Sequence, residues 1–214
     1  MTRVKICGIT TPGDAKLAVE AGAWAIGLIF AQPSPRRCDV GVASEIGRTM
    51  RRQVEVAGVF RNSPLDEVVE LADLCSLTMV QLHGDEGPTY CAEAAHRTGL
   101  KVIKAARVRD RASVQALRAF RVAVDYHLLD AFVEGVPGGT GQTFRWDLAK
   151  ERGPGPALIL SGGITADNVS EAIAGVHPYA VDSASGTEAS PGVKDPAKVT
   201  ALMRAVEQAS LATA

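Results

Sequence analysis

The chain has 214 residues, of which 46% are hydrophobic and 22% are charged, so it can bury a large core in one large domain or two small ones. A formal net charge of −1 argues against a nucleic-acid binder, because such proteins are usually basic overall or carry a Lys/Arg tract. The N-terminal residues contain no secretory apolar region, and no apolar run approaches the roughly 18 residues of a membrane span. We therefore expect a cytoplasmic protein that binds neither nucleic acid nor membrane, and that holds any anionic ligand by a local group of charges.

The four cysteines, Cys7, Cys38, Cys75 and Cys91, form no CxxC pair and no Cys/His cluster with the spacing of a zinc site. We expect neither a disulfide framework nor a metal centre. Free cysteine is more often a small buried hydrophobe than a reactive thiol. Cys7 nevertheless draws attention, because the apolar run VKIC ends at it and a glycine follows.

Eight short apolar or β-branched runs predict strands at residues 4–9, 25–30, 54–60, 79–83, 102–105, 126–130, 157–160 and 179–182. Helix start signals lie between most of them: Pro12 after Thr11, Pro64 after Ser63, Thr165 alone, and Pro196 after Asp195. The segment RRCDVGVASEIGRTMRR has only a modest helical period and no clear N-cap, so the helix expected there has the weakest signal. Strand and helix thus alternate along the chain.

This alternation of buried strands and helical crossovers predicts a parallel sheet. Eight strands without a linker or a shift in composition favour an α/β fold in which residues 1–214 form a single domain, a parallel eight-stranded (β/α)8 TIM barrel. An open doubly wound sheet is the alternative, and it would call for a GxGxxG sequence after the first strand. That sequence is absent, since Gly8 is followed by Ile-Thr-Thr-Pro.

Reactive side chains stand where the predicted strands end. Cys7, His83 and Asp130 each fall at the carboxyl end of a strand, and Arg36 lies in the loop after the second strand. Each residue alone has an ordinary explanation, as a packed thiol, a structural histidine, a helix cap or a solvated surface group. Because active sites of such barrels lie at the carboxyl ends of the strands, the four together predict a pocket there.

Two stretches of small residues follow the seventh and eighth predicted strands. LSGGIT contains Gly162 and Gly163, and VDSASGTE contains Ser183, Ser185 and Gly186, small donors suited to the start of a short extra helix. Loops at these positions commonly bind phosphate through backbone N–H groups and a helix N-terminus. Glycines alone often only permit tight turns, but both stretches at the expected places favour a phosphate site.

The motifs KICGIT, SPR, VQLHGDE, VIKA, LLDA…GGTGQTFRW, LSGGIT and VDSASGTE…PGVKD run in this order from Lys5 to Asp195. The set resembles that of the phosphoribosylanthranilate isomerases, enzymes of tryptophan biosynthesis. The resemblance implies a (β/α)8 barrel without cofactor or metal that acts on a small phosphorylated substrate, as a monomer or a homodimer. It implies an aldose–ketose isomerase that converts N-(5-phosphoribosyl)anthranilate to 1-(2-carboxyphenylamino)-1-deoxyribulose 5-phosphate by an Amadori rearrangement.

The resemblance also implies roles for single residues. Asp130 is expected to be the general acid that protonates the ring oxygen, and Cys7 the general base that removes the C2 proton. A carboxyl group is an acid near neutral pH only if its pKa is raised, and a thiol is a good base only as thiolate, so the pocket has to set both protonation states. Arg36 is expected to bind the anthranilate carboxylate through its planar guanidinium.

Other positions are implied in less detail. The glycine-rich segment 135–141 is expected to fold over the substrate, with Gly139 and Gly141 among the substrate-binding residues. His83 is expected in the substrate-binding region as well, where it either positions a polar group or supports the structure.

The resemblance also bears on two lysines of the predicted strands and on two positions where this sequence differs from the family pattern. Lys5 and Lys104 are expected on barrel strands, with their aliphatic stems inside and their charges paired. Ala31 stands where relatives often have an aromatic residue, and Arg61 where an apolar residue is common. These departures leave the chemistry intact but leave open the contacts around the anthranilate ring.

Other interpretations remain beside this one. The chain could be another sugar-phosphate barrel enzyme, such as an epimerase, or an isomerase that also serves histidine biosynthesis. The latter would act on a substrate with two phosphates, and no second phosphate-binding glycine loop occurs near the middle of the chain. An inactive barrel that acts as a binding module is a third interpretation, and the presence of both Cys7 and Asp130 argues against it.

Overall fold

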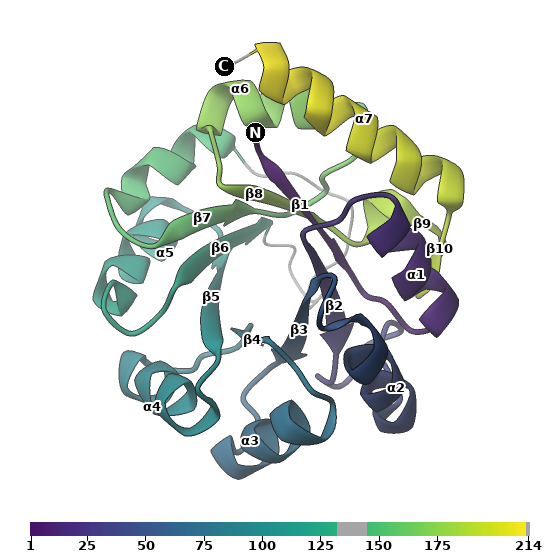
Figure 1. The fold of residues 1–214 in the computed structure, drawn as a ribbon. Coiled ribbons are helices and arrows are strands. Elements are labelled where there is room, and N and C mark those ends of the chain that lie inside the picture. The colour runs from purple at the N-terminus through teal and green to yellow at the C-terminus, as the bar shows by residue number, and fades with distance from the viewer. Residues whose placement is uncertain (132–144, 213–214) are drawn as a thin grey trace.

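Eight parallel strands close into a barrel in the computed structural model, which describes residues 1–131 and 145–212 (Figure 1). The strands are β1 (Arg3–Cys7), β2 (Ala25–Ile29), β3 (Glu55–Phe60), β4 (Met79–Leu82), β5 (Lys101–Val108), β6 (Tyr126–Ala131), β7 (Ala157–Leu160) and β8 (Ala180–Ser183). Each strand pairs with the next along the chain, and β8 pairs with β1, which places Lys5 beside Asp182. The predicted barrel and its eight strands are confirmed, although β1 stops at Cys7 and β5 continues to Val108.

Helices surround the barrel on its outer side (Figure 1). They are α1 (Pro12–Glu20), α2 (Val40–Met50), α3 (Leu65–Leu74), α4 (Pro88–Thr98), α5 (Arg111–Gln115), α6 (Val169–Val176) and α7 (Pro196–Ala212). Short 3-10 helices follow α5, β6 and β8: η1 (Ala116–Phe120), η2 (Trp146–Arg152) and η3 (Ser185–Thr187). The last of these is the short extra helix expected at Ser185. Within the described ranges, none of the helices has the length and apolarity needed to cross a membrane.

Side-chain caps explain where several helices begin. Thr11 caps α1 and Asp195 caps α7 by accepting hydrogen bonds from N–H groups of the first turn, as the sequence predicts. The expectation that the second helix lacks a clear cap was wrong. Asp39 accepts hydrogen bonds from the N–H groups of Gly41 and Val42, so α2 begins immediately after this aspartate.

Two predicted helix starts are shifted. Pro64 occupies the N-cap position of α3 rather than its first turn, and no side chain caps that helix. α6 begins at Val169, after a turn in which the Asn168 side chain accepts a hydrogen bond from the Thr165 N–H and donates one to the Gly163 carbonyl. Asn168 thereby ties the start of this helix to the loop after β7.

Two apolar layers hold the barrel together. Outward-facing strand residues such as Ile6 and Leu28 pack against the helices. The inward-facing plug consists of Ala57, Met79, Ile103, Ala105, Tyr126, Leu128, Ile159 and Ala180. Strand side chains alternate between the two faces, so polar residues two positions after plug residues also face inward: Gln81, Asp130, Ser161 and Asp182. The polar floor of the site therefore lies directly above the apolar plug.

An antiparallel hairpin, β9 (Glu188–Ser190) and β10 (Val193–Lys194), follows η3 and was not expected from the sequence. It lies beside α1 (Figure 1). Thr10 Oγ1 donates a hydrogen bond to the Gly192 carbonyl at 2.6 Å, which fixes the turn of the hairpin to the loop after β1. The hairpin thus brings residues near the C-terminus against the end of the first strand.

Candidate active site

A cavity of about 300 Å³ lies at the carboxyl ends of the strands. The residues predicted from the sequence that line it are Cys7, Arg36, His83, Asp130, Gly162, Gly163 and Ser185. Ile29, Pro33 and Val59 add apolar wall surface, and Ala31 and Arg61, the two departures from the family pattern, line the cavity as well. The topology therefore brings most of the predicted residues together in one place.

Cys7 lies at the end of β1, next to a buried ion pair. Lys5 is fully buried on the same face of the strand, and its Nζ lies 2.8 Å from Asp182 Oδ1. Ser161 Oγ donates a hydrogen bond to Asp182 Oδ2 at 3.1 Å. The prediction that Lys5 has a charge partner is confirmed, because Asp182 on the neighbouring strand provides it.

Burial and this ion pair together set the pKa of the thiol. Burial raises the pKa of Cys7, whereas the nearby ammonium group of Lys5 acts in the opposite direction. Burial alone would lower the pKa of Lys5, but its interactions with Asp182 and Cys7 outweigh that effect and raise it. Lys5 therefore stays charged and favours the thiolate form of Cys7.

Asp130 lies on β6 and faces a histidine across the cavity floor. Asp130 Oδ2 is 3.3 Å from His83 Nε2, and His83 Nδ1 is 3.0 Å from Gln81 Nε2. Gln81 is only 1% exposed and lines the cavity, yet its Oε1 has no hydrogen-bond partner among the described residues. This oxygen is available to accept a hydrogen bond from a ligand. His83 contacts the predicted acid, so its position fits a role in orienting Asp130.

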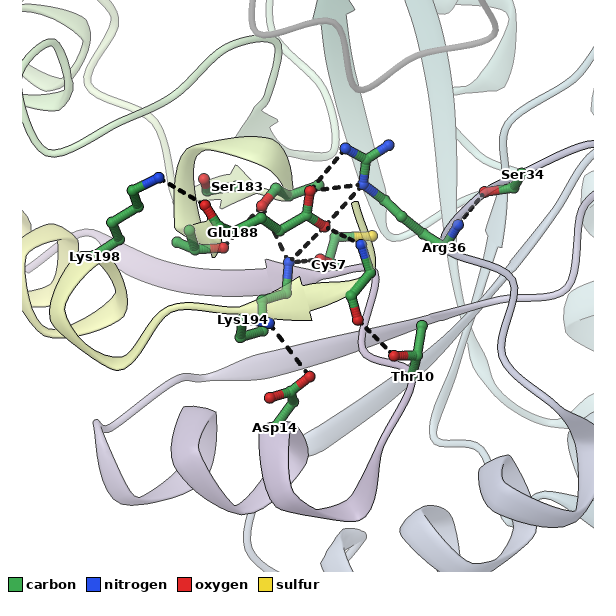
Figure 2. A network of polar contacts seen from close by, with 12 residues as sticks. Cys7, Thr10, Asp14, Ser34, Arg36, Ser183, Glu188, Lys194 and Lys198 are labelled. Atoms are coloured by element: carbon green, nitrogen blue, oxygen red, sulfur yellow. Dashed lines mark hydrogen bonds and ion pairs between the residues drawn. The ribbon is translucent and has the colours of Figure 1, made fainter. Parts of the chain in front are cut away.

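Arg36 is held side-on by a carboxylate to which the sequence motifs assign no role. Its Nε donates to Glu188 Oε1 at 2.8 Å, and its Nη2 donates to Glu188 Oε2 at 2.7 Å (Figure 2). The third nitrogen, Nη1, has no hydrogen bond to any described residue and points away from Glu188 (Figure 2). Arg36 thus retains both N–H groups of Nη1 and the second N–H of Nη2 for a ligand.

The loop after β7 contains two glycines in the left-handed region of backbone conformation. Gly162 and Gly163 have φ values of +86° and +67°, which disfavour side chains. A Cβ at Gly162 would also lie 2.5 Å from the Ala131 backbone nitrogen. Glycine is therefore required at position 162 to let the loop after β7 approach the end of β6 beside the cavity.

Two members of the predicted phosphate set lie elsewhere. Ser183 and Gly186 do not line the cavity. Ser183 Oγ donates a hydrogen bond to the Ile164 carbonyl at 2.7 Å, and a Cβ at Gly186 would lie 2.1 Å from the same oxygen. These contacts join the loops after β7 and β8. The assignment of Ser183 and Gly186 to the phosphate site stays a prediction.

The remaining predictions concern the glycine-rich segment and a metal. Gly139 and Gly141, with the segment 135–141, lie outside the described residues. In residues 1–131 and 145–212, no group of three or more His, Cys, Asp or Glu side chains is arranged to hold a metal ion.

Several residues of the site were missed by sequence reasoning. Glu188 and Lys194 stand within the motifs VDSASGTE and PGVKD but carried no predicted role, because only the hairpin brings them to Arg36 and Cys7. Gln81 carried a usable signal, since a glutamine at an inward position of a buried apolar strand requires a polar partner.

Comparisons with known proteins agree with this geometry. The model of the N-(5'-phosphoribosyl)anthranilate isomerase family matches residues 4–205. A curated isomerase of this name from Geotalea uraniireducens is 50% identical over 202 residues, which cover 93% of this chain and 95% of the relative.

Solved structures give the same result. The crystal structure of phosphoribosyl anthranilate isomerase from Thermotoga maritima has a TM-score of 0.88 and 36% identity, covering 97% of this chain and 100% of the other. A phosphoribosyl anthranilate isomerase in complex with reduced 1-(o-carboxyphenylamino)-1-deoxyribulose 5-phosphate has a TM-score of 0.85 and 34% identity, with coverage of 97% and 100%. The chain therefore belongs to the N-(5'-phosphoribosyl)anthranilate isomerase family and converts N-(5'-phosphoribosyl)anthranilate to 1-(2-carboxyphenylamino)-1-deoxyribulose 5-phosphate in tryptophan biosynthesis.

Proposed function

We propose that this barrel performs the isomerisation by general acid–base catalysis, with Asp130 as the acid and Cys7 as the base. The observation that supports the proposal is that a buried thiol from β1 and a carboxyl group from β6 line the same cavity. Asp130 gives a proton to the ring oxygen of the aminoaldose as the bond from that oxygen to C1 breaks, leaving an iminium ion. The Cys7 thiolate then removes the C2 proton, and the resulting enolamine tautomerises to the ketose.

The neighbours of these two groups assist them. Lys5 stabilises the thiolate form of Cys7 against the effect of burial. His83 orients the carboxyl group of Asp130, and Gln81 Oε1 accepts a hydrogen bond from a substrate hydroxyl or from the anilino N–H. Each helper thus acts on one reacting group or on the bound substrate.

Two anion sites orient the substrate in this proposal. The Nη1 group of Arg36 binds the anthranilate carboxylate, which balances a buried cluster where Arg36 and Lys194 face the single carboxylate of Glu188. N–H groups of Gly162, Gly163 and Ser185 bind the phosphate, as expected of loops after the last two strands of a barrel. The co-crystallised product analogue of the related isomerase carries both anionic groups.

The enzyme acts in the cytoplasm on this small phosphorylated substrate, as a monomer or a homodimer. One solved structure, 34% identical, is of monomers generated from the dimeric phosphoribosylanthranilate isomerase of Thermotoga maritima. Light scattering at the concentrations used for assays decides between the two states.

Complementation tests the function. The gene is expected to restore growth of a tryptophan auxotroph that lacks this isomerase, but not of a histidine auxotroph that lacks the corresponding sugar-phosphate isomerase. Purified protein is assayed in parallel for consumption of N-(5'-phosphoribosyl)anthranilate. No growth and no turnover by folded protein would refute the proposal, and growth of both auxotrophs would show a broader substrate range.

A further inference from the structure

The hairpin β9–β10 places two buried charged residues behind Arg36. Glu188 and Lys194 are 5% and 4% exposed, and Arg36 is 8% exposed. Besides its bonds to Arg36, Glu188 Oε1 lies 3.2 Å from Lys194 Nζ and accepts a weaker contact from the Gly192 N–H at 3.3 Å. Both carboxylate oxygens are therefore engaged inside the protein and cannot swing toward a ligand.

Lys194 extends this network to the catalytic strand. Its Nζ donates hydrogen bonds to the Cys7 carbonyl at 2.7 Å and to the Ala184 carbonyl at 3.0 Å (Figure 2). On the outer side, Lys198 Nζ donates to the Glu188 carbonyl at 2.7 Å, so the backbone of Glu188 is fixed as well. The carboxylate behind Arg36 is thus held from several sides by separate elements.

The geometry of the pair determines which part of Arg36 is exposed to the cavity. A side-on contact through Nε and Nη2 fixes the plane of the guanidinium, because both parallel bonds must be kept at once. Arginine has many rotamers, and a ligand that binds a free arginine must order it first. Here Glu188 has already ordered the side chain.

We propose that Glu188 is a positioning residue for carboxylate recognition, which fixes Arg36 so that its end-on edge, Nη1 and the second N–H of Nη2, meets the carboxylate of the substrate. The inference rests on the proposed role of Arg36. Glu188 does not touch the substrate, so it acts through Arg36 alone. Lys194 supports the arrangement by holding Glu188 and by joining it to the end of β1.

Two inhibitors separate this role from a general structural one. The first is the reduced product, 1-(2-carboxyphenylamino)-1-deoxyribitol 5-phosphate, and the second is the same compound without its carboxylate. The parent enzyme is expected to bind the first about 100-fold more tightly, as a charge-assisted contact would give. Glu188→Asp keeps the charge but is one methylene too short for the side-on contact, and it is expected to reduce this preference to about tenfold or less. Inhibition by inorganic phosphate is expected to stay within about twofold of the parent.

Control variants make the result specific. Glu207→Asp changes an exposed glutamate on α7 and is expected to leave the preference unchanged. Glu188→Gln combined with Lys194→Met keeps the size of the cluster and its net charge, and it is expected to lose the preference even if Glu188→Asp folds poorly. A folded Glu188→Asp or double variant with the full 100-fold preference would overturn the inference.

Arg36→Met distinguishes failure of this inference from failure of the proposed function. If Arg36→Met keeps the preference for the carboxylate, Arg36 does not bind it and the proposed role of Arg36 is wrong. If Arg36→Met abolishes the preference while Glu188→Asp retains it, only the positioning role is wrong. Adding Glu188→Asp to Arg36→Met is expected to leave the affinity for the carboxylate-bearing inhibitor the same as in Arg36→Met alone. A lower affinity in the double variant would show that Glu188 acts on binding other than through Arg36, and it would overturn the inference.

Discussion

Gly27 lies directly beside Cys7 across the β1–β2 pair, and the absence of a side chain at Gly27 makes room for the thiol. A Cβ at Gly27 would lie 2.6 Å from Cys7 Sγ and 3.1 Å from Lys5 Nζ. It would also lie 3.2 Å from the Cα of Cys7, so the strand has little freedom to move away. The position of the Cys7 thiol therefore depends on a glycine in the neighbouring strand.

Gly27→Ala is expected to displace the thiol and to lower kcat at least tenfold, because small misplacements of a reacting group are costly. Inhibition by inorganic phosphate should stay near the parental value. Gly175→Ala is the matched control, since a Cβ there meets nothing within 4 Å and α6 gains about 0.5–1 kcal/mol of helix propensity. Normal kcat in a folded Gly27→Ala enzyme would show that the thiol position is not critical.

Removing the acid or the base is expected to separate catalysis from binding. Cys7→Ser replaces an ionisable thiol with a hydroxyl, and Asp130→Asn keeps the shape but removes the transferable proton. Each variant should lose at least roughly 100-fold in kcat, the low end for a positioned acid or base. Calorimetry with the reduced product is expected to show near-parental affinity for both. If Cys7→Ser keeps its turnover, the thiol only packs.

The pH dependence of the rate follows from the environment of Cys7. Burial raises the pKa of this thiol. In an Asp130→Asn enzyme, where Cys7 is the remaining member of the proposed acid–base pair, the residual kcat/KM is expected to rise with pH into the alkaline range as the thiolate fraction increases. Lys5→Met combined with Asp182→Asn removes the ion pair without leaving an unpaired buried charge. Because Lys5 lowers the pKa of Cys7 more than Asp182 raises it, this limb is expected to move to higher pH. A stopped-flow or fluorescence pH–rate profile measures the shift, and an unmoved limb would mean that another group is the base.

Much of the fold could be predicted from the sequence because each strand is a continuous apolar run bounded by a polar or glycine residue. Alternation of strands and helices then limits the topology, and a barrel puts all carboxyl ends on one face. That is why the sequence alone suffices to bring Cys7, His83 and Asp130 together. Caps were less predictable: Asp39 caps α2, although no clear N-cap was expected for that segment.

The parts of the site that escaped prediction depend on long-range packing. Glu188 reaches Arg36 across 152 positions of the sequence, through a hairpin with strands of three and two residues. Ser183 and Gly186 stand in a loop with the composition of a phosphate site, and composition did not reveal their close contact with the Ile164 carbonyl. Composition identifies residues that are able to bind an anion, while only the packing of the loops decides which of them face it.

The two lysines of β5 give a direct test of how burial governs the contribution of an ion pair to stability. Lys104 Nζ lies 2.7 Å from Glu86 Oε2, and the side chains are 6% and 2% exposed. Lys101 pairs with Glu55 on the same sheet, but its side chain is 48% exposed. Lys104→Met leaves a buried carboxylate without its cation and is expected to lower the free energy of unfolding at pH 7 by about 3–5 kcal/mol. Lys101→Met should cost about 0–1 kcal/mol, as for exposed pairs.

The destabilisation caused by Lys104→Met is expected to depend on pH, because it depends on the charge of Glu86. Burial alone would raise the pKa of Glu86, but Lys104 and two backbone N–H groups outweigh it and hold the pKa below its ordinary value. In the parent, the stabilisation by this carboxylate is therefore present above its ordinary pKa and is lost as the pH falls through the lowered one. In Lys104→Met no ammonium group counteracts the effect of burial on Glu86, so Glu86 becomes protonated at a higher pH than in the parent. Protonation removes the unpaired buried charge.

Urea denaturation of parent and variant at pH 7 and pH 4 tests this expectation. The difference in the free energy of unfolding between parent and variant is expected to be smaller at pH 4. Glu86→Gln combined with Lys104→Met should recover much of the loss at pH 7, whereas a gap of the same size at both pH values would mean that lost packing of the lysine stem, not charge, is responsible.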